Sequence, residues 1–273
     1  MSPNTSSLET KAARVREILQ EFPRVAVAFS GGVDSTLLLR LALDTLGAAQ
    51  VLAITGVTEL IPAREVQEAE ELAQALGART LFVREQALAL AQVAANPADR
   101  CYHCKAFLFA RFRALAEEAG FPVLLDGANA DDVGDWRPGQ QAARELGVRS
   151  PLQEAGMTKA DVRALSRALG LPTWEKPSYA CLASRVPYGT PLTREILAAI
   201  EAGEEYLRAL GFVQLRVRHH GELARIELVA EEIPRLLDPA LRTRVTARFR
   251  ELGYRYVAVD LQGYRTGSMN EVL

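Results

Sequence analysis

A phosphate-binding turn is predicted at residues 30–35, Ser-Gly-Gly-Val-Asp-Ser. The turn follows a run of hydrophobic and β-branched residues at 24–29 and leads into a leucine-rich helical pattern at 34–46. Paired glycines let the backbone approach a ligand closely, and the amides at the start of a helix favour an anion. The alternative is an ordinary strand-to-helix turn, for which one glycine usually suffices.

The turn is not a Walker sequence, because no Lys-Ser/Thr pair ends it, and its spacing does not match a dinucleotide fingerprint. It resembles the PP-loop, SGGxDS, of the adenine nucleotide alpha-hydrolase-like superfamily. Enzymes of that superfamily split ATP between the α- and β-phosphates and adenylate an oxygen of their substrate. The resemblance implies that the turn holds pyrophosphate and that the end of the next strand meets adenine; the residues concerned are Ser30, Gly31, Gly32, Asp34, Ser35 and Thr55.

Carboxylates near this turn indicate a metal ion. Asp34 is expected to help hold Mg²⁺, because a carboxylate beside polyphosphate is otherwise repelled; the alternative is an ordinary acidic residue in a first helical turn. A second polar cluster at 126–132 follows a hydrophobic run, where it should lie near the nucleotide. Asp126, Asn129 and Asp132 are candidates for ribose, metal or loop-positioning contacts, and a solvated loop is the alternative.

The three cysteines are too few for a disulfide scaffold. Cys101 and Cys104 form a CxxC pair at the start of a predicted helix, where thiol pKa values fall and redox, metal or sulfur chemistry is favoured. Cys181 stands alone in a loop that contains prolines. Three thiols without a fourth suit a [4Fe-4S] cluster with one open iron better than a zinc site, and three unrelated thiols are the alternative.

A parallel sheet is predicted to position these residues. Strand-like runs alternate with helical patterns up to about residue 174; the strands are expected at 24–29, 50–55, 79–83 and 122–127, and the helices at 34–46, 62–76, 105–119, 138–146 and 158–169. This alternation predicts an α/β fold with a doubly wound parallel sheet and ligands at the carboxyl ends of its strands. Residues 1–180 are expected to form a PP-loop ATP-binding domain.

A smaller C-terminal α+β domain is predicted for residues 181–273. The stretch 175–193 contains three prolines and no clear period, which is typical of a loop or linker. The patterns that follow predict helices at 193–210, 231–236 and 239–251, and strands at 212–219, 223–229 and 254–260.

The composition favours a cytoplasmic globular protein. The chain has 273 residues, 49% of them hydrophobic, and a formal net charge of -2. It contains no apolar run long enough to cross a bilayer and no secretory-type apolar stretch at its N-terminus. Residues 190–273 carry as many acidic as basic side chains. We therefore expect no membrane partner, and the charge balance argues against a nucleic-acid surface.

The chain resembles the LarE family over nearly its whole length. The resemblance is carried by SGGVDS (30–35), CYHCK (101–105), DGANADD (126–132), the long block 149–193, LRVRHHGELARIEL (215–228) and DLQGYRTGSMNE (260–271). LarE proteins are ATP-dependent sulfur transferases in the biosynthesis of the nickel-pincer nucleotide cofactor of lactate racemase. The resemblance implies adenylation of a carboxylate on pyridinium-3,5-biscarboxylic acid mononucleotide, release of pyrophosphate, attack by sulfur and formation of a thiocarboxylate.

The substrate that this resemblance implies carries two carboxylates and a phosphate, so its site needs cations. Arg216 and Arg218 alternate on a predicted strand and share one of its faces. With Arg185 and Arg225 they are candidates to clamp those anions through forked hydrogen bonds, and Glu227 is a candidate to orient them or to bind substrate. A solvated charged strand face is the alternative.

Two sulfur strategies occur in the family. In one, a cysteine at the position of Cys181 gives up its own sulfur and becomes dehydroalanine. In the other, a CxxC pair and that cysteine bind a [4Fe-4S] cluster, which takes sulfide or another sulfur donor. This chain has all three cysteines, which favours the cluster type.

Other functions are also open. A tRNA thiolase of the same superfamily would need a basic RNA surface, and a non-catalytic nucleotide sensor would make the cysteines superfluous. The family and the hydrophobic last strand both suggest a homo-oligomer.

Overall fold

The computed structural model describes residues 3–132, 138–177 and 180–265. The chain forms two compact units, each described by itself below. The first contains residues 1–86 and 99–179, and the second contains residues 87–98 and 180–273. The sequence pattern gave no sign that segment 87–98 belongs with the C-terminal part of the chain. Residues 266–271 of the terminal motif lie outside the described ranges.

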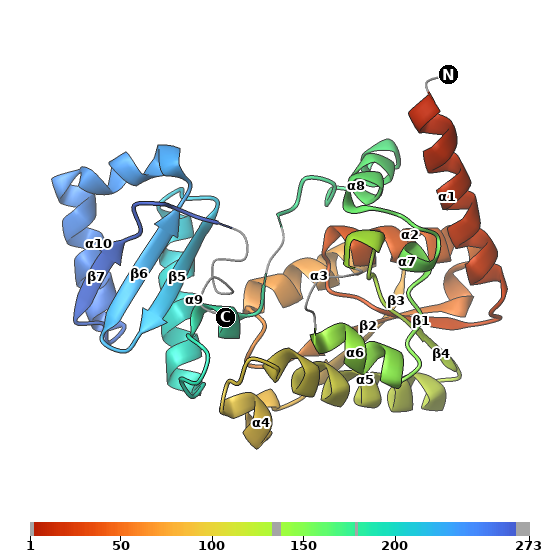
Figure 1. The fold of residues 1–273 in the computed structure, drawn as a ribbon, viewed down its shortest axis with the longest axis horizontal. Coiled ribbons are helices and arrows are strands. Elements are labelled where there is room, and N and C mark those ends of the chain that lie inside the picture. The colour runs from red at the N-terminus through yellow and green to blue at the C-terminus, as the bar shows by residue number, and fades with distance from the viewer. Residues whose placement is uncertain (1–2, 133–137, 178–179, 266–273) are drawn as a thin grey trace. The chain divides into compact units, whose positions relative to one another are not determined.

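The first unit is built on a four-stranded parallel sheet (Figure 1). Its strands lie in the order β3-β2-β1-β4, and they are β1 (Val25–Ala28), β2 (Val51–Val57), β3 (Arg79–Arg84) and β4 (Val123–Leu125). Val25 of β1 lies opposite Val51 on one side and Val123 on the other. All four strands therefore end at the same edge of the sheet, which is where the predicted site residues follow them.

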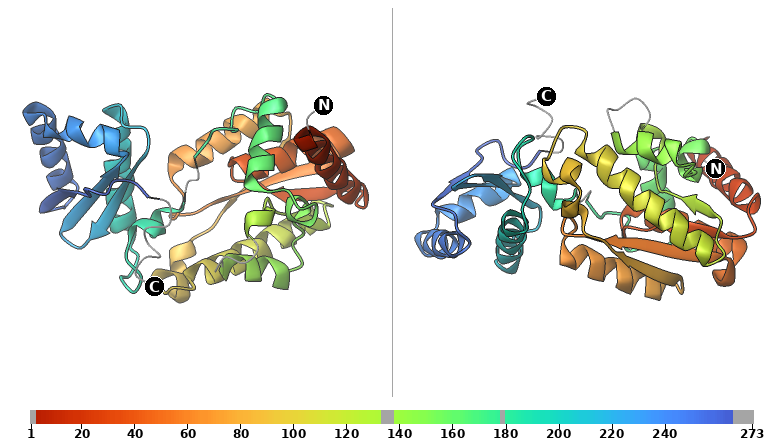
Figure 2. Two further views of the ribbon diagram at one scale, coloured as in Figure 1. Left: turned by 45° about the horizontal axis from the view of Figure 1, so that its top comes forward. Right: turned by 90° about the horizontal axis from the view of Figure 1, so that it is seen from below.

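Helices cover both faces of this sheet, which confirms the doubly wound α/β prediction. Figures 1 and 2 show α5 and α6 on the opposite side of the strands from α2 and α3. The helical segments of the unit are α1 (Pro3–Gln20), α2 (Val33–Leu46), η1 (Ala48–Gln50), α3 (Ala63–Ala75), α5 (Arg100–Glu118), η3 (Ala130–Asp132), α6 (Pro138–Glu145), α7 (Pro151–Glu154) and α8 (Lys159–Ala168).

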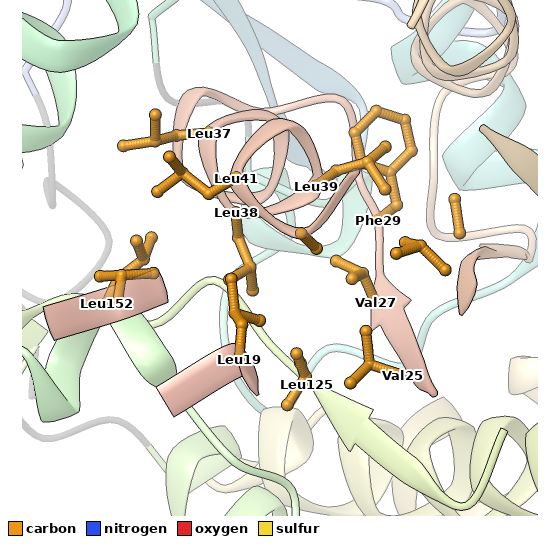
Figure 3. Packing of buried hydrophobic residues seen from close by; sticks show 14 of the residues in the cluster. Leu19, Val25, Val27, Phe29, Leu37, Leu38, Leu39, Leu41, Leu125 and Leu152 are labelled. Carbon is orange, nitrogen blue, oxygen red and sulfur yellow. The ribbon is translucent and has the colours of Figure 1, made fainter. Parts of the chain in front are cut away.

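The larger core lies between β1 and the helices α1, α2, α7 and α8. Figure 3 shows Leu38 of α2 beside Leu19 of α1, with Val27 and Leu125 of the sheet close by. Every one of these side chains is fully buried. This packing fixes where α2 begins, and with it the turn that the sequence predicts to bind phosphate.

Three helices of the first unit differ from the sequence-based expectation: α1 and the short α7 were not predicted, and α5 begins earlier than predicted. Helix α1 was not predicted, although the apolar residues Ala12, Val15 and Leu19 follow helical spacing and are buried. Helix α5 begins at Arg100, five residues earlier than the predicted Lys105. As a result, Cys101 lies inside the first turn of α5.

The second unit contains a three-stranded mixed sheet, as expected for a small α+β domain. Its order is β5-β6-β7, with β5 antiparallel to β6 and β6 parallel to β7. Its elements are η2 (Ala87–Ala89), α4 (Ala91–Ala94), η4 (Leu182–Arg185), α9 (Arg194–Ala209), β5 (Leu215–His220), β6 (Leu223–Leu228), η5 (Ala230–Leu237), α10 (Pro239–Glu251) and β7 (Tyr256–Val259).

Strand alternation divides the side chains of this sheet between two faces. Val217 and Ile226 pair on the face that α9 covers, where Gly203 lets the ring of Phe249 approach. Arg216 and Arg218 point to the other face. Across the described residues, no helix is both long and apolar enough to span a membrane.

Replacing Leu38 with alanine should destabilise the first unit by about 3 kcal/mol, because it leaves a cavity at the centre of the larger core. Urea denaturation followed by circular dichroism measures this change in the free energy of unfolding. Glu70→Ala, on the exposed side of α3, is the control and should change it by less than about 0.5 kcal/mol. Equal effects of the two substitutions would contradict the assignment of this core.

Candidate active site

The turn between β1 and α2 is held tightly against α3. Gly31 has a φ of 68°, a left-handed conformation that glycine adopts without strain. A Cβ at this position would also lie 3.1 Å from Cα of Ala69 in α3. Both the conformation and the lack of space explain the first glycine. Gly32 is the N-cap of α2 and has no side chain that could cap the helix, so a bound anion can take that place.

The hydroxyl groups of Ser30 and Ser35, the two serines of the turn, contact each other. Their Oγ atoms lie 3.2 Å apart, and Ser35 Oγ also accepts a hydrogen bond from the Ser30 amide at 3.3 Å. Ser30 Oγ accepts one from the Gly32 amide at 3.4 Å, and Ser35 Oγ donates to the Gly32 carbonyl at 3.3 Å. These contacts link Ser30, Gly32 and Ser35 and fix the conformation of the turn.

The turn and the polar cluster after β4 are brought together, as the shared edge of the sheet predicts. A Cβ on Gly127 would lie 2.8 Å from the amide nitrogen of Ser35, so only glycine allows this approach. Asn129 Nδ2 donates to Asp34 Oδ1 at 3.0 Å. The two segments are therefore in direct contact at the N-terminus of α2.

Asp126 and Asp132 shape the loop between them. Asp126 Oδ1 accepts hydrogen bonds from Ser150 Oγ at 2.6 Å and from the Ala128 amide at 3.2 Å. Asp132 Oδ2 accepts one from the Asn129 amide at 2.9 Å. Of the three roles that the sequence left open for these residues, the contacts of these two carboxylates are those of loop positioning.

Lys159 is a site residue that the sequence analysis missed. Its ammonium group forms an ion pair with Asp34 Oδ2, and its amide donates to Asp131 Oδ2 at 2.8 Å. Thr158 and Asp161 form a capping box at the start of α8. A lysine in a first helical turn opposes the helix dipole, and this was the available signal that it has a partner elsewhere.

A second lysine, Lys176, contacts the turn directly. Its Nζ donates to the Gly31 carbonyl at 3.2 Å and pairs with Glu65 at 3.3 Å and Glu68 at 2.8 Å, both on α3. Burial alone would raise the pKa of Glu68, but Lys176 and Arg64 together hold it below its usual value. Lys176 thus adds a cation at the edge of the turn that no motif had indicated.

Thr55, predicted near adenine, links the ends of two strands. Its hydroxyl donates to the Phe29 carbonyl at 2.8 Å, and the side chain is buried. This bond fixes the carboxyl end of β2 against the residue that precedes the turn.

The three cysteines are divided between the two units. Cys101 is exposed and Cys104 is half-buried, and their spacing places both on one side of α5. Arg100 Nη2 donates to Cys101 Sγ at 3.9 Å. Cys181 is half-buried and is the N-cap of η4 in the second unit. Among the side chains of residues that the structure describes, no three of the types His, Cys, Asp and Glu are arranged to hold a metal ion.

Arg185, predicted to bind substrate, is 1% exposed and makes its contacts within the protein. Its Nε donates to Glu204 Oε1 at 2.9 Å and its Nη2 donates to Oε2 at 3.1 Å. Burial would raise the pKa of Glu204, but Arg185 and the neighbouring arginines keep it below its usual value. The sequence analysis missed Glu204, because nothing in the helical pattern distinguished it from its neighbour Glu205.

The other predicted substrate-binding residues lie together on β5 and β6. Arg218 forms a two-pronged ion pair with Glu227, at 2.9 Å and 2.7 Å. Arg225 shares that carboxylate at 3.1 Å and lies 3.6 Å from Asp260. The guanidinium of Arg216 stacks on the ring of Tyr264, 5.1 Å from its centre. These side chains form a mostly positive cluster in which Glu227 orients two arginines.

Comparison with known proteins agrees with this fold. The family model described as NAD synthase matches residues 8–117, which include the turn and most of the sheet. The chain is 42% identical to the pyridinium-3,5-bisthiocarboxylic acid mononucleotide synthase of Lactiplantibacillus plantarum, with 98% of this chain and 96% of that protein covered. It is also 42% identical to an uncharacterized protein of Synechocystis sp., over 97% and 99% of the two chains. An uncharacterized protein of Methanocaldococcus jannaschii is 27% identical over 89% and 91%.

A parallel sheet with a glycine turn of this kind at the end of β1 defines the PP-loop class of ATP-using enzymes. Within this class, the chain belongs to the LarE family, because the identity extends over nearly the full length of both proteins.

Gly127→Ala should weaken nucleotide binding by at least about tenfold, because the new Cβ would displace the start of α2 by overpacking. Isothermal titration with ATP measures the affinity, and the thermal midpoint is recorded on the same samples. Wild-type affinity in this variant would contradict a nucleotide site at this contact.

Glu204→Gln should destabilise the second unit at neutral pH by about 3 kcal/mol, because it leaves buried arginines without their counter-charge. Since the pKa of Glu204 is lowered on folding, this contribution is present above pH 4.5 and is lost as the pH falls below it. The stability difference from wild type should therefore shrink in acid, by at most about 1.4 kcal/mol per pH unit. Denaturation curves at a series of pH values provide the measurement, and a difference independent of pH would contradict the charge pairing.

Proposed function

We propose that this protein uses ATP to adenylate a carboxylate of pyridinium-3,5-biscarboxylic acid mononucleotide and then converts it to a thiocarboxylate. The observation that carries the proposal is the direct contact between the SGGVDS turn and the loop after β4, through Gly127 and Asn129. The full-length similarity to a synthase named for the corresponding bisthiocarboxylic acid product supports the choice of substrate.

The first step needs a site that stabilises departing pyrophosphate. A carboxylate oxygen of the substrate attacks the α-phosphorus of ATP, and the bond to the bridging oxygen of pyrophosphate breaks. Charge builds up on that leaving group, and fixed donors that already point at it lower the barrier. We propose that the amides at the start of α2 do this, together with Ser30, Ser35 and Lys176, which contact the turn.

Asp34 is the residue that we propose to hold Mg²⁺. Each of its oxygens accepts one contact from the protein, from Asn129 and from Lys159. A carboxylate has about four lone-pair positions, so each oxygen keeps one for a cation. Phosphate oxygens of ATP would complete the coordination, as is usual for this ion. Lys159 and Asn129 would then set the direction in which Asp34 presents its charge.

The second step needs a sulfur nucleophile, which we propose that the three cysteines provide. Cys101 and Cys104 on α5 and Cys181 at the start of η4 are the residues that would hold a [4Fe-4S] cluster with one open iron. When bound, such a cluster would supply a sulfide obtained from a sulfur donor. Arg100 places a positive charge beside Cys101, and the thiolate is the form of cysteine that binds iron.

The products of this step balance without a further reactant. Sulfur bonds to the carbonyl carbon of the acyl adenylate, and AMP leaves with the oxygen that came from the carboxylate.

We propose that Arg216 and Arg225 hold the phosphate and the second carboxylate of the substrate, oriented by Tyr264 and Glu227. The protein is further proposed to act as a homo-oligomer.

Anaerobic purification followed by iron and sulfide analysis tests the sulfur route. We expect about four irons per chain in the wild type and loss of iron in Cys104→Ser. Mass spectrometry of the peptide that contains Cys181, after turnover with ATP and the pyridinium substrate, should show an intact cysteine. Dehydroalanine at position 181 would instead establish transfer of the cysteine's own sulfur and would overturn the cluster route.

A further inference from the structure

Two of the arginines predicted to bind substrate donate to the backbone of the turn that carries Cys181. Arg185 Nη1 donates to the carbonyl oxygens of Ala180 and Cys181, the second at 3.1 Å, and to Ser184 Oγ at 3.1 Å. Arg218 Nη1 donates to the Ser184 carbonyl at 2.8 Å. Both guanidinium groups therefore end on the same few residues, Ala180 to Ser184, which lie in one unit.

Each of these guanidinium groups is bound by a buried glutamate on the edge that does not contact the turn. Glu204 is 2% exposed and takes Nε and Nη2 of Arg185, while Glu227 is 0% exposed and takes Nε and Nη2 of Arg218. In both pairs the carboxylate binds the same two nitrogens, which leaves Nη1 facing the turn. The two ion pairs thus have the same geometry, although their residues come from α9, β5, β6 and η4.

Buried ion pairs of this kind are a poor way to gain stability alone. Removing two charges from water costs several kcal/mol per ion, and well-packed hydrophobic residues often serve the fold as well. A guanidinium, however, carries five N–H donors in a rigid plane. It can bind both oxygens of a carboxylate with one edge and carbonyl oxygens with the other, whereas a lysine presents a single nitrogen and an apolar side chain has no donor.

The carboxylate of Glu204 accepts hydrogen bonds from two further donors, one on β5 and one on α9 itself. Its Oε1 accepts the amide of Val217 on β5 at 3.1 Å, and its Oε2 accepts Arg208 Nη2 at 3.2 Å. Arg208 also pairs with Glu205. It donates no hydrogen bond to the described residues 180–184 of the turn. Arg208 therefore provides a matched control: it touches the same carboxylate without touching the segment that carries the cysteine.

A third buried group holds the chain just after the turn. Asn96, fully buried with a φ of 55°, donates from Nδ2 to the carbonyls of Pro187 at 2.8 Å and Thr190 at 3.0 Å. Its own carbonyl accepts the Gly189 amide at 2.9 Å. Segment 87–98 thus extends the same restraint beyond η4, which gives a physical reason for its place in the second unit.

We infer that the pairs Arg185–Glu204 and Arg218–Glu227 form a clamp that fixes the backbone of the Cys181 turn, so that both arginines are positioning residues for this cysteine. The inference rests on the proposed role of Cys181 in sulfur transfer, because a reactive group must be held in a defined place by the residues around it. It assigns Arg185 and Arg218 a task different from that of Arg216 and Arg225.

Hydrogen exchange of the reduced, cluster-free protein tests the clamp. Arg185→Lys and Arg218→Lys keep the charge but replace the planar guanidinium with a single nitrogen, which loses the two-pronged contact with the glutamate that directs Nη1 at the turn. Each should speed exchange of the Ser184 and Val186 amides, which bond within the turn, by at least about tenfold relative to amides of α9. Alkylation of Cys181 by iodoacetamide, measured relative to Cys101 by peptide mass spectrometry, should change in the same two variants. Arg208→Lys should leave both readings at the wild-type level.

An equal rise in exchange throughout the second unit would show that the pairs serve only general stability and would overturn the clamp. If the variants fail to fold, the wild type alone decides: its Ser184 amide should exchange as slowly as those of β5, and exchange at the rate of an open loop would contradict the inference. These measurements need neither iron nor substrate. A failure of the clamp is therefore distinguishable from a failure of the proposed function, which the iron analysis and turnover experiment test.

Discussion

The first unit depends on one close approach, that of Gly127 to the amide of Ser35. Parallel strands β1 and β4 are neighbours in the sheet and end at the same edge. The segments that follow the two strands therefore lie against each other, with their backbones in close contact. The absence of a side chain at Gly127 lets the second loop lie directly on the first turn of α2. The contact between Asn129 and Asp34 follows from this approach, as does the concentration of polar groups at one edge of the sheet.

Both units solve the problem of fixing a loop in the same way. A carboxylate accepts two or more donors, and one of them is a cation from another segment of the chain. Asp34 pairs with Lys159 beside the phosphate turn, and Glu204 pairs with Arg185 behind the Cys181 turn. Such pairs contribute little to stability compared with an apolar core, but they hold backbone atoms in place. The two proposed chemical steps would require this of the SGGVDS turn and the Cys181 turn.

The sequence predicted the α/β fold and the PP-loop because both are local patterns, read from strand and helix periods and from glycine spacing. It also placed Arg216 and Arg218 on one face of a strand correctly. It missed Lys159, Lys176 and Glu204, whose roles depend on partners that only the folded chain brings near. The Arg218–Glu227 pair likewise depends on the register of β5 against β6. The sequence of either strand by itself does not reveal that register.

In the proposed reaction, ATP activates a carboxylate of the substrate by adenylation. The most direct test supplies ATP with pyridinium-3,5-biscarboxylic acid mononucleotide labelled with oxygen-18 in its carboxylates, and measures the mass of the AMP that is released. Attack of a carboxylate on the α-phosphorus predicts AMP that carries one labelled oxygen, together with unlabelled pyrophosphate. Unlabelled AMP, or formation of ADP in its place, would contradict the account.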